Sequence, residues 1–258
     1  MKFCCYMNES SEQLTIEQAN SLSVVVIVNQ IGPRQTQSTI RVGSSFLLNK
    51  TLHSSKRILV TNRHVLEEAL KYAGVLQVAA YDGTLISVTG YYHASDLDLC
   101  TLILPYHEML KDGLSIDEGL KNTGTMVHTW GFPRPYMFFA PLLTVGYVSG
   151  FHNQQYYLNM GINPGNSGGP LISSGQVIGV IVNKLVDRTD DISKKIQSLK
   201  VVGGMLTMSD GEKHVDIAST IAEAFEFTTS TSQLVIGGAI TSDLLKKFID
   251  IVLIELDK

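Results

Sequence analysis

Short apolar runs recur along the first hundred positions of the chain, at a spacing of about ten residues. Residues 24–28 form a continuous β-branched run, which is typical of a strand buried on both faces. The runs at 76–81 and 85–92 flank Asp82-Gly83, a dipeptide that favours a tight hairpin turn. Further strands are expected at 40–48, 57–61 and 99–104. This spacing predicts a barrel or a sandwich, and argues against alternating strands and helices.

A second series of apolar runs follows a polar, glycine-containing stretch at residues 106–123. Its expected strands are 125–130, 142–150, 155–160, 170–172, 177–183 and 201–207. Residues 186–199 are polar and are expected on the surface. Helical spacing of apolar residues then predicts helices at 217–227 and 243–256, and a capping-box pattern predicts one at 10–20. The apolar side of the last helix packs either on the barrel or on another subunit.

The composition is that of a well-packed globular protein, with 44% hydrophobic and 17% charged residues. The formal net charge of −4 gives no electrostatic basis for binding nucleic acid or an anionic membrane surface. No apolar stretch approaches the ~18 residues of a membrane-spanning helix. We therefore expect neither nucleic acid nor a membrane as a partner.

The cysteines and the N-terminus favour a reducing compartment. The three cysteines are Cys4, Cys5 and Cys100, and this number does not make a disulfide framework. The first residues turn polar by Asn8 and lack the apolar stretch of a signal peptide. A cytoplasmic location is therefore the expectation.

Residues 165–171, Gly-Asn-Ser-Gly-Gly-Pro-Leu, are the most informative segment. A serine hydroxyl is a poor nucleophile unless its surroundings activate it. Gly165 allows a tight turn that presents its N–H beside that of Ser167, and converging N–H groups form an oxyanion hole. We place Gly165, Asn166 and Ser167 there. The two glycines after Ser167 allow the backbone to approach its neighbours closely.

A nucleophilic serine needs a base on a rigid support, and His64 fits this requirement best. It stands where the apolar run 58–60 passes into a turn and a short helix. On this pattern alone, the histidine could equally just satisfy the end of a strand. The other six histidines lack this context, and no pair has metal-ligand spacing with a nearby carboxylate or cysteine. No metal is therefore expected.

Two carboxylates compete to orient that histidine, Asp96 and Asp98. The orienting group has to be buried beside the imidazole. Asp98 directly precedes the apolar run 99–104 and is favoured, whereas Asp96 is the alternative and equally suits a solvated turn.

These three segments resemble the motifs of trypsin-like serine peptidases. Residues 165–171 resemble their nucleophile loop, in the Gly-Asn-Ser-Gly-Gly form of the HtrA-like branch. Thr-Asn-x-His-Val around His64 and the upstream residues 43–48 resemble the histidine segment and its preceding strand. Asp-Leu-x-x-Leu at Asp98 resembles the aspartate strand. The order His, Asp, Ser is that of the chymotrypsin type.

The resemblance implies an all-β, chymotrypsin-like fold of two six-stranded antiparallel β-barrels packed face to face, with short N-terminal and C-terminal helices. In the implied acyl transfer, Ser167 attacks, His64 moves the proton and Asp98 orients the imidazole, without a metal or organic cofactor. The expected division is an N-terminal helical segment (1–22), a first barrel (23–105), a connection (106–123), a second barrel (124–210) and a C-terminal helical addition (211–258).

The chain departs from the secreted trypsins at several positions. Val65 stands where those enzymes carry a disulfide-forming cysteine. Asn166 stands where they carry an aspartate that pairs with a newly freed N-terminus, so activation by that route is not expected. The HtrA family usually adds a PDZ domain after the protease, and the residues after the second barrel are too few for one.

The resemblance also indicates a substrate pocket. Gly161 stands where trypsins place the acid at the floor of the pocket, and Val182 and Asn183 are expected on the substrate-side strand. A small or apolar substrate side chain is therefore favoured. The sequence predicts a serine endopeptidase that acts on a protein or peptide. A regulatory protein partner and a homo-oligomer are both compatible with it. The alternatives are a non-catalytic protein-binding module on the same fold and an esterase with the same triad.

Overall fold

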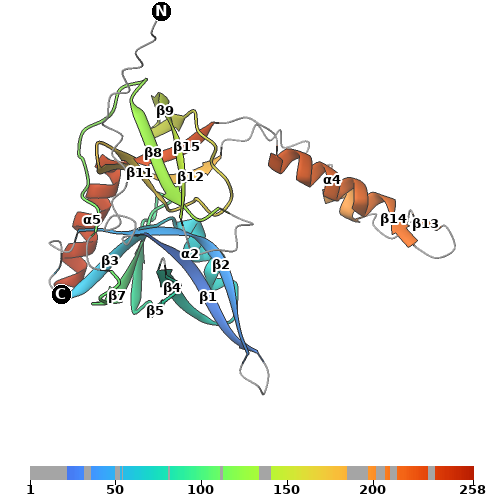
Figure 1. Cartoon of the computed structure of the whole chain (residues 1–258), viewed down its shortest axis with the longest axis horizontal. Helices are drawn as coiled ribbons and strands as arrows, with labels where there is room; N and C mark the ends of the chain where they lie inside the picture. Colours follow the sequence, from blue (N-terminus) through green and yellow to red (C-terminus); the bar gives the residue numbers. More distant parts are fainter. Residues whose placement is uncertain are drawn as a thin grey trace, which may run out of the picture. The chain divides into compact units, whose positions relative to one another are not determined.

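The computed structural model describes residues 22–31, 36–49, 53, 55–80, 82–110, 113–133, 141–184, 197–201, 207–209, 214–231 and 236–258 (Figure 1). The contacts divide the chain into a larger unit, Met1–Lys184 with Gly237–Lys258, and a smaller unit, Leu185–Ile236. The helix predicted at 10–20 and the two N-terminal cysteines, Cys4 and Cys5, lie outside the described residues.

The first half of the larger unit is a seven-stranded antiparallel sheet, in the order β5-β4-β1-β2-β3-β7-β6. Its strands are β1 (Leu22–Ile31), β2 (Thr36–Leu47), β3 (Lys56–Thr61), β4 (Val75–Ala80), β5 (Leu85–Ser87), β6 (Gly90–His93) and β7 (Cys100–Pro105). Six strands were expected. The run 85–92 divides in two because β5 pairs with β4 whereas β6 pairs with β7. Gly83, at φ +90°, forms part of the predicted turn before β5.

The second half is a closed six-stranded barrel, in the order β10-β15-β12-β11-β8-β9. Its strands are β8 (Met126–Gly131), β9 (Leu142–His152), β10 (Gln155–Leu158), β11 (Pro170–Ser173), β12 (Gln176–Lys184) and β15 (Gly237–Thr241). The predicted all-β fold of two antiparallel halves is confirmed, and so is the six-stranded second barrel.

The sixth strand of this barrel corrects the expected division. Residues 237–241, assigned above to the helical addition, form β15 and pair with both β10 and β12. The small residues of this strand give only a weak apolar pattern, but they are needed for packing. A Cβ at Gly237 would lie 2.5 Å from the Ile162 side chain. Most of the strand predicted at 201–207 lies outside the described residues; at its ends, Val201 is helical and Thr207 begins β13 of the smaller unit.

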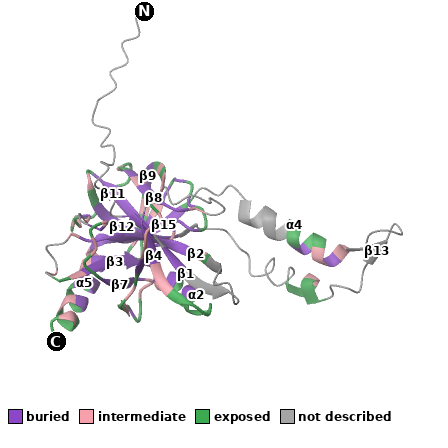
Figure 2. Ribbon diagram, turned by 60° about the horizontal axis from the view of Figure 1, so that its bottom comes forward, coloured by how far each residue is buried: buried purple, intermediate pink, exposed green. Residues whose placement is uncertain are grey.

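Alternation along the strands explains the continuous apolar runs of the first half. Leu59 and Leu102 belong to the cluster that fills its interior. Their neighbours Ile58 and Ile103 belong to a second cluster, which also includes residues of the second barrel and of the last helix. Successive side chains of a strand point to opposite faces, so both faces of β3 and β7 are buried. Figure 2 shows the buried residues concentrated in these strands.

The last helix, α5 (Ser242–Leu256), packs on β12 and β15. Its buried side, which includes Leu245, Phe248 and Ile249, joins the cluster between the halves. The opposite side carries the exposed Ile251 and Ile254. The helix predicted at 243–256 is confirmed, and its apolar side is occupied by the chain's own barrel.

A short segment of the connection joins the two halves through backbone bonds. Leu114 forms a bridge with Leu48, at the end of β2, and Ile116 forms one with Val177 of β12. Both are isolated parallel β-bridges, each formed by one residue pair. They fix the two halves side by side, and this arrangement positions the site described below.

The smaller unit lies in the sequence between β12 and β15. Its described elements are a helical stretch at 197–201, the hairpin of β13 (Thr207–Ser209) and β14 (His214–Asp216), and then α4 (Ile217–Thr231). The helix predicted at 217–227 is thus confirmed. Within the described residues, none of the helices has the length and apolar character needed to cross a membrane.

Candidate active site

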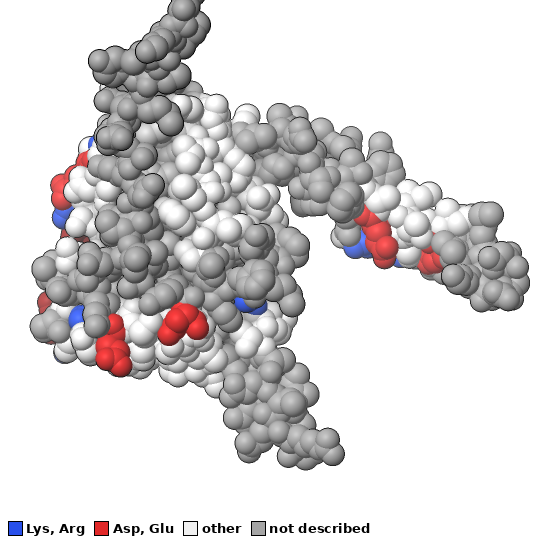
Figure 3. Space-filling model, in the orientation of Figure 1, with Lys and Arg blue, Asp and Glu red and all other residues white. Residues whose placement is uncertain are grey.

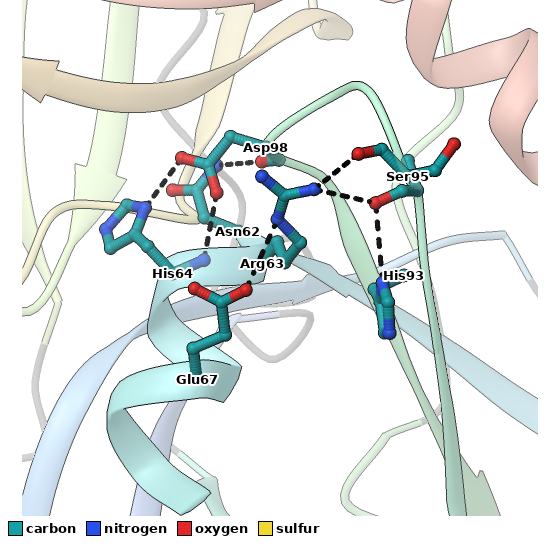
Figure 4. Close-up of polar contacts among 8 residues, drawn as sticks. Asn62, Arg63, His64, Glu67, His93, Ser95 and Asp98 are labelled. Atoms are coloured by element: carbon teal, nitrogen blue, oxygen red, sulfur yellow. Dashed lines mark hydrogen bonds and ion pairs between the residues drawn. The ribbon is translucent and has the colours of Figure 1, made fainter. Parts of the chain in front are cut away.

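His64 is held by a double contact with Asp98 (Figure 4). The imidazole lies on the second residue of α2 (Arg63–Leu70), directly after β3. The backbone N–H of His64 donates to Asp98 Oδ1 at 2.9 Å, and Nδ1 lies 2.6 Å from Asp98 Oδ2. A carboxylate only accepts, so Nδ1 carries a proton, and in the neutral imidazole Nε2 is then the acceptor. The structure thus places Asp98 against the imidazole, whereas Asp96 is exposed.

The loop that carries Asp98 is held against α2 by two further side chains. The fully buried Asn62 donates from Nδ2 to Asp98 O at 2.9 Å. Arg63 donates from Nη1 to the carbonyls of Ala94 and Ser95, at 3.1 and 2.8 Å (Figure 4). Sequence reasoning did not find these two residues. The Thr-Asn-x-His-Val pattern marked their positions without showing which distant loop they contact.

Cys100 is buried next to this loop, and its thiol is unreactive. Burial raises the pKa of its thiol to about 12, and the negative charge of Asp98 acts in the same direction. The thiolate is the reactive form of cysteine. Cys100 therefore stays protonated at neutral pH and is no competing nucleophile.

Ser167 lies on a loop between β10 and β11 that is shaped by backbone hydrogen bonds. Asn166 N donates to Asn163 O at 3.0 Å, and Gly169 N donates to Asn166 O at 2.9 Å. Gly165 and Gly168 have φ of +100° and +84°, which side chains with a Cβ rarely adopt. The glycines that flank the serine are thus needed for the shape of this loop.

The two N–H groups predicted to line the oxyanion hole, those of Gly165 and Ser167, are available as donors. Among the hydrogen bonds between described residues, none uses the N–H of Gly165 or of Ser167. Both residues line one cavity together with His64. Asn166, the residue between them that was also assigned to the oxyanion hole, uses its own N–H within the turn, where it donates to Asn163 O.

The hydroxyl of Ser167 donates to the carbonyl of Val182 at 2.8 Å. Within the described residues, it makes no hydrogen bond with His64. Both side chains nevertheless line the same cavity of about 340 Å³. The structure therefore brings Ser167, His64 and Asp98 together at the junction of the two halves, with the serine hydroxyl bonded to Val182 O.

Residues 43–180 match the family model described as "Trypsin-like peptidase domain". This range is more than half of the chain and contains His64, Asp98 and Ser167. The chain belongs to the trypsin-like peptidase family.

Two curated relatives come from Bacillus subtilis (strain 168). Serine protease Do-like HtrB is 32% identical over 141 residues, which are 49% of this chain and 30% of the relative. Serine protease Do-like HtrA is 29% identical over 164 residues, which are 58% of this chain and 34% of the relative. The chain spans about a third of the length of these relatives.

A solved structure, "HtrA-type protease AlgW with decapeptide", has the same fold. Its TM-score is 0.60 at 17% sequence identity, and the match covers 93% of this chain and 66% of AlgW. At this identity the likeness concerns the fold alone. It agrees with the two packed antiparallel halves described above.

The three predicted pocket residues of this trypsin-like peptidase differ in their relation to Ser167. Val182 is buried, and its carbonyl contacts the Ser167 hydroxyl. Gly161 is exposed, and a Cβ built there would have no atom within 4 Å. Asn183 pairs through its backbone with Gly238 of β15. Only Val182 is thus in contact with the nucleophile.

The charged side chains shown in Figure 3 do not form a large patch of one sign. Figure 3 shows one face of the molecule, on which the described acidic and basic side chains are scattered. At the cavity, Glu68 and Lys71 form an ion pair of 2.8 Å. The described residues hold no cluster of His, Cys, Asp and Glu suited to a metal ion.

Proposed function

We propose that this trypsin-like peptidase is a serine endopeptidase that cleaves peptide bonds through Ser167, His64 and Asp98. The observation that carries the proposal is the 2.6 Å contact between His64 Nδ1 and Asp98 Oδ2, beside a cavity that Ser167 shares. An imidazole held in this way presents an unprotonated Nε2 to a hydroxyl across the cavity.

The chemistry is acyl transfer in two stages. Ser167 Oγ attacks the substrate carbonyl while His64 Nε2 takes its proton, and the N–H groups of Gly165 and Ser167 stabilise the oxyanion. The protonated imidazole then gives its proton to the leaving amine, which leaves an acyl group on Ser167. A water molecule, deprotonated by His64, releases the acid and restores the serine. Asp98 stabilises the charged imidazole at both stages.

The resting position of the Ser167 hydroxyl adds a step to this scheme. Its bond to Val182 O has to break, and the hydroxyl has to rotate so that it donates to His64 Nε2. Catalytic hydrogen bonds are often loose before substrate binds and tighten in the complex. We infer that the bound substrate selects the rotated hydroxyl.

The substrate side chain next to the scissile bond is small or apolar in this proposal. Support comes from the buried apolar Val182 and from Gly161, which places no charge in the open space around it. A regulatory protein partner, a homo-oligomer and a cytoplasmic location stay predictions from the sequence.

A fluorophosphonate probe tests the nucleophile, and a peptide library with matched esters tests the reaction. The wild-type chain is expected to be labelled at Ser167 and to cleave peptides. Ser167→Ala should abolish both signals. The matched control is Ser149→Ala, which removes an exposed hydroxyl from β9 and should leave both unchanged.

Three outcomes would contradict the proposal, and they differ from one another. Labelling with turnover of esters alone would favour the esterase. Retained binding of a partner with neither labelling nor turnover would favour the protein-binding module. Labelling that survives Ser167→Ala would move the nucleophile to another residue.

A further inference from the structure

Ser44 of β2 belongs to the first half, but its side chain contacts the nucleophile loop of the second. Its hydroxyl donates to Gly165 O at 2.6 Å and accepts from Phe132 N at 3.0 Å. Its backbone N–H donates to Ser167 O at 2.8 Å. Ser44 is 1% exposed, so water cannot replace these bonds. One residue therefore holds the loop on both sides of Asn166.

These bonds hold two peptide groups of the loop, Gly165–Asn166 and Ser167–Gly168. The Gly165–Asn166 peptide is held at its oxygen by Ser44 and at its nitrogen by Asn163. Ser44 N holds the carbonyl of Ser167. Glycine has no Cβ to restrict its rotation, so Gly165 depends on such bonds for its φ of +100°. Without the Ser44 hydroxyl, the peptide has a single remaining tether.

The support of Ser44 extends to the arm that carries the histidine. Thr61, the last residue of β3, donates from Oγ1 to Ser44 O at 2.8 Å. Gly168 lies so close that a Cβ there would be 2.2 Å from Ser44 O. Ser44 thus stands between the strand that leads to His64 and the loop that carries Ser167.

We propose that Ser44 is a positioning residue whose hydroxyl holds the Gly165 peptide, so that the N–H groups of Gly165 and Ser167 face the developing oxyanion. This inference rests on the proposed serine peptidase function. Donors fixed in advance stabilise charge that appears only in the transition state. Loss of the hydroxyl should therefore slow the chemical step more than it weakens binding of the probe.

The chain offers a matched control in the next residue. Ser45 is also fully buried, but its hydroxyl lies 2.7 Å from Ser23 Oγ and donates to Ser23 O at 3.3 Å, within the first half. Ser45→Ala removes a buried hydroxyl from the same strand without touching the nucleophile loop. A merely structural role predicts the same behaviour for Ser44→Ala and Ser45→Ala.

The test measures phosphonylation by an alkyl fluorophosphonate over a range of concentrations. Ser44→Ala is expected to lower the maximal rate constant about 10- to 100-fold, less than the full loss of an oxyanion donor, with the apparent dissociation constant within about 3-fold. Ser45→Ala should keep both values within about 3-fold. Ser44→Cys keeps a small side chain with a weak donor and should give an intermediate rate.

Hydrogen exchange of the segment 161–170 gives a second readout that does not depend on turnover. Faster exchange in Ser44→Ala, but not in Ser45→Ala, is expected because the loop loses a tether. If the wild type is labelled and Ser44→Ala has the same labelling rate and the same hydrogen exchange as Ser45→Ala, the inference is overturned and the proposed function stands. If Ser44→Ala does not fold, a Ser44→Cys variant that reacts at the wild-type rate likewise overturns the inference but not the proposed function. An unlabelled wild type would overturn both.

Discussion

The two arms of the site are held in place by different means. In the histidine arm, residues 58–64 and 94–98, side chains make the bonds: Asp98 holds the imidazole, while Asn62 and Arg63 hold the loop of Asp98. In the serine arm, residues 161–169, most bonds are made by the backbone, with Gly165 and Gly168 in conformations suited to glycine, and the Ser44 hydroxyl adds one side-chain bond from β2. Removing a side chain should therefore damage the first arm most, and adding a Cβ should damage the second.

The strongest test removes the reacting group of each arm. Ser167→Ala and His64→Ala should each lower kcat by a factor on the order of 10⁴ to 10⁶, because each leaves the attack without its nucleophile or its base. The double variant should lose little more. Steady-state kinetics on one peptide substrate gives all three values, and losses that multiply would show that the arms act independently.

Asp98→Asn tests the central contact of the histidine arm. The amide cannot accept the Nδ1 proton in the same way, so the wrong imidazole tautomer is favoured, and kcat should fall on the order of 10³- to 10⁴-fold. Asp96→Asn, two residues away and exposed, should change kcat less than about 2-fold. Equal losses from the two variants would contradict the assignment.

Gly168→Ala tests the serine arm. A Cβ there would meet Ser44 O at 2.2 Å and Thr61 Oγ1 at 2.4 Å, so unfolding in urea should become easier by about 3 kcal/mol or more. Gly124→Ala is the control, since its φ of +88° is similar but nothing lies within 4 Å of the added atom. Its cost should be about 1–2 kcal/mol, from backbone strain alone. A similar cost at both positions would show that the close approach at Gly168 is unimportant.

Arg63→Ala has the smallest expected effect. It removes the bonds to the Ala94 and Ser95 carbonyls but leaves the Asp98 contacts, so kcat should fall about 10-fold at most while the fold persists. Lys246→Ala, which breaks an exposed ion pair of 3.4 Å with Glu118, should leave kcat unchanged. An unaltered kcat in Arg63→Ala would limit the histidine arm to Asp98 and Asn62.

The sequence predicted those features that depend on short, local patterns of residues. Ser167, His64 and the preference for Asp98 follow from short segments, and most strands follow from apolar runs. Ser44 and Gly165 are 121 positions apart, and no local pattern shows that such residues touch. β15 was missed because Gly237 and its neighbours are small, so the strand has little apolar pattern. The unavailability of the Asn166 N–H depends on a turn geometry that composition does not show.

The late position of β15 has a consequence for how this molecule matures during synthesis. β10 and β12 both pair with this strand, which is separated from β12 by the whole smaller unit. Until residue 241 has left the ribosome, both strands present unpaired edges and the barrel stays open. Ile181 of β12 lies opposite Ala239 of β15 on one side, while its backbone N–H and C=O bond Gly169 and Gly168 of the serine loop on the other. The strand segment that supports the serine loop therefore gains its second neighbour, β15, only after the whole smaller unit has been synthesised.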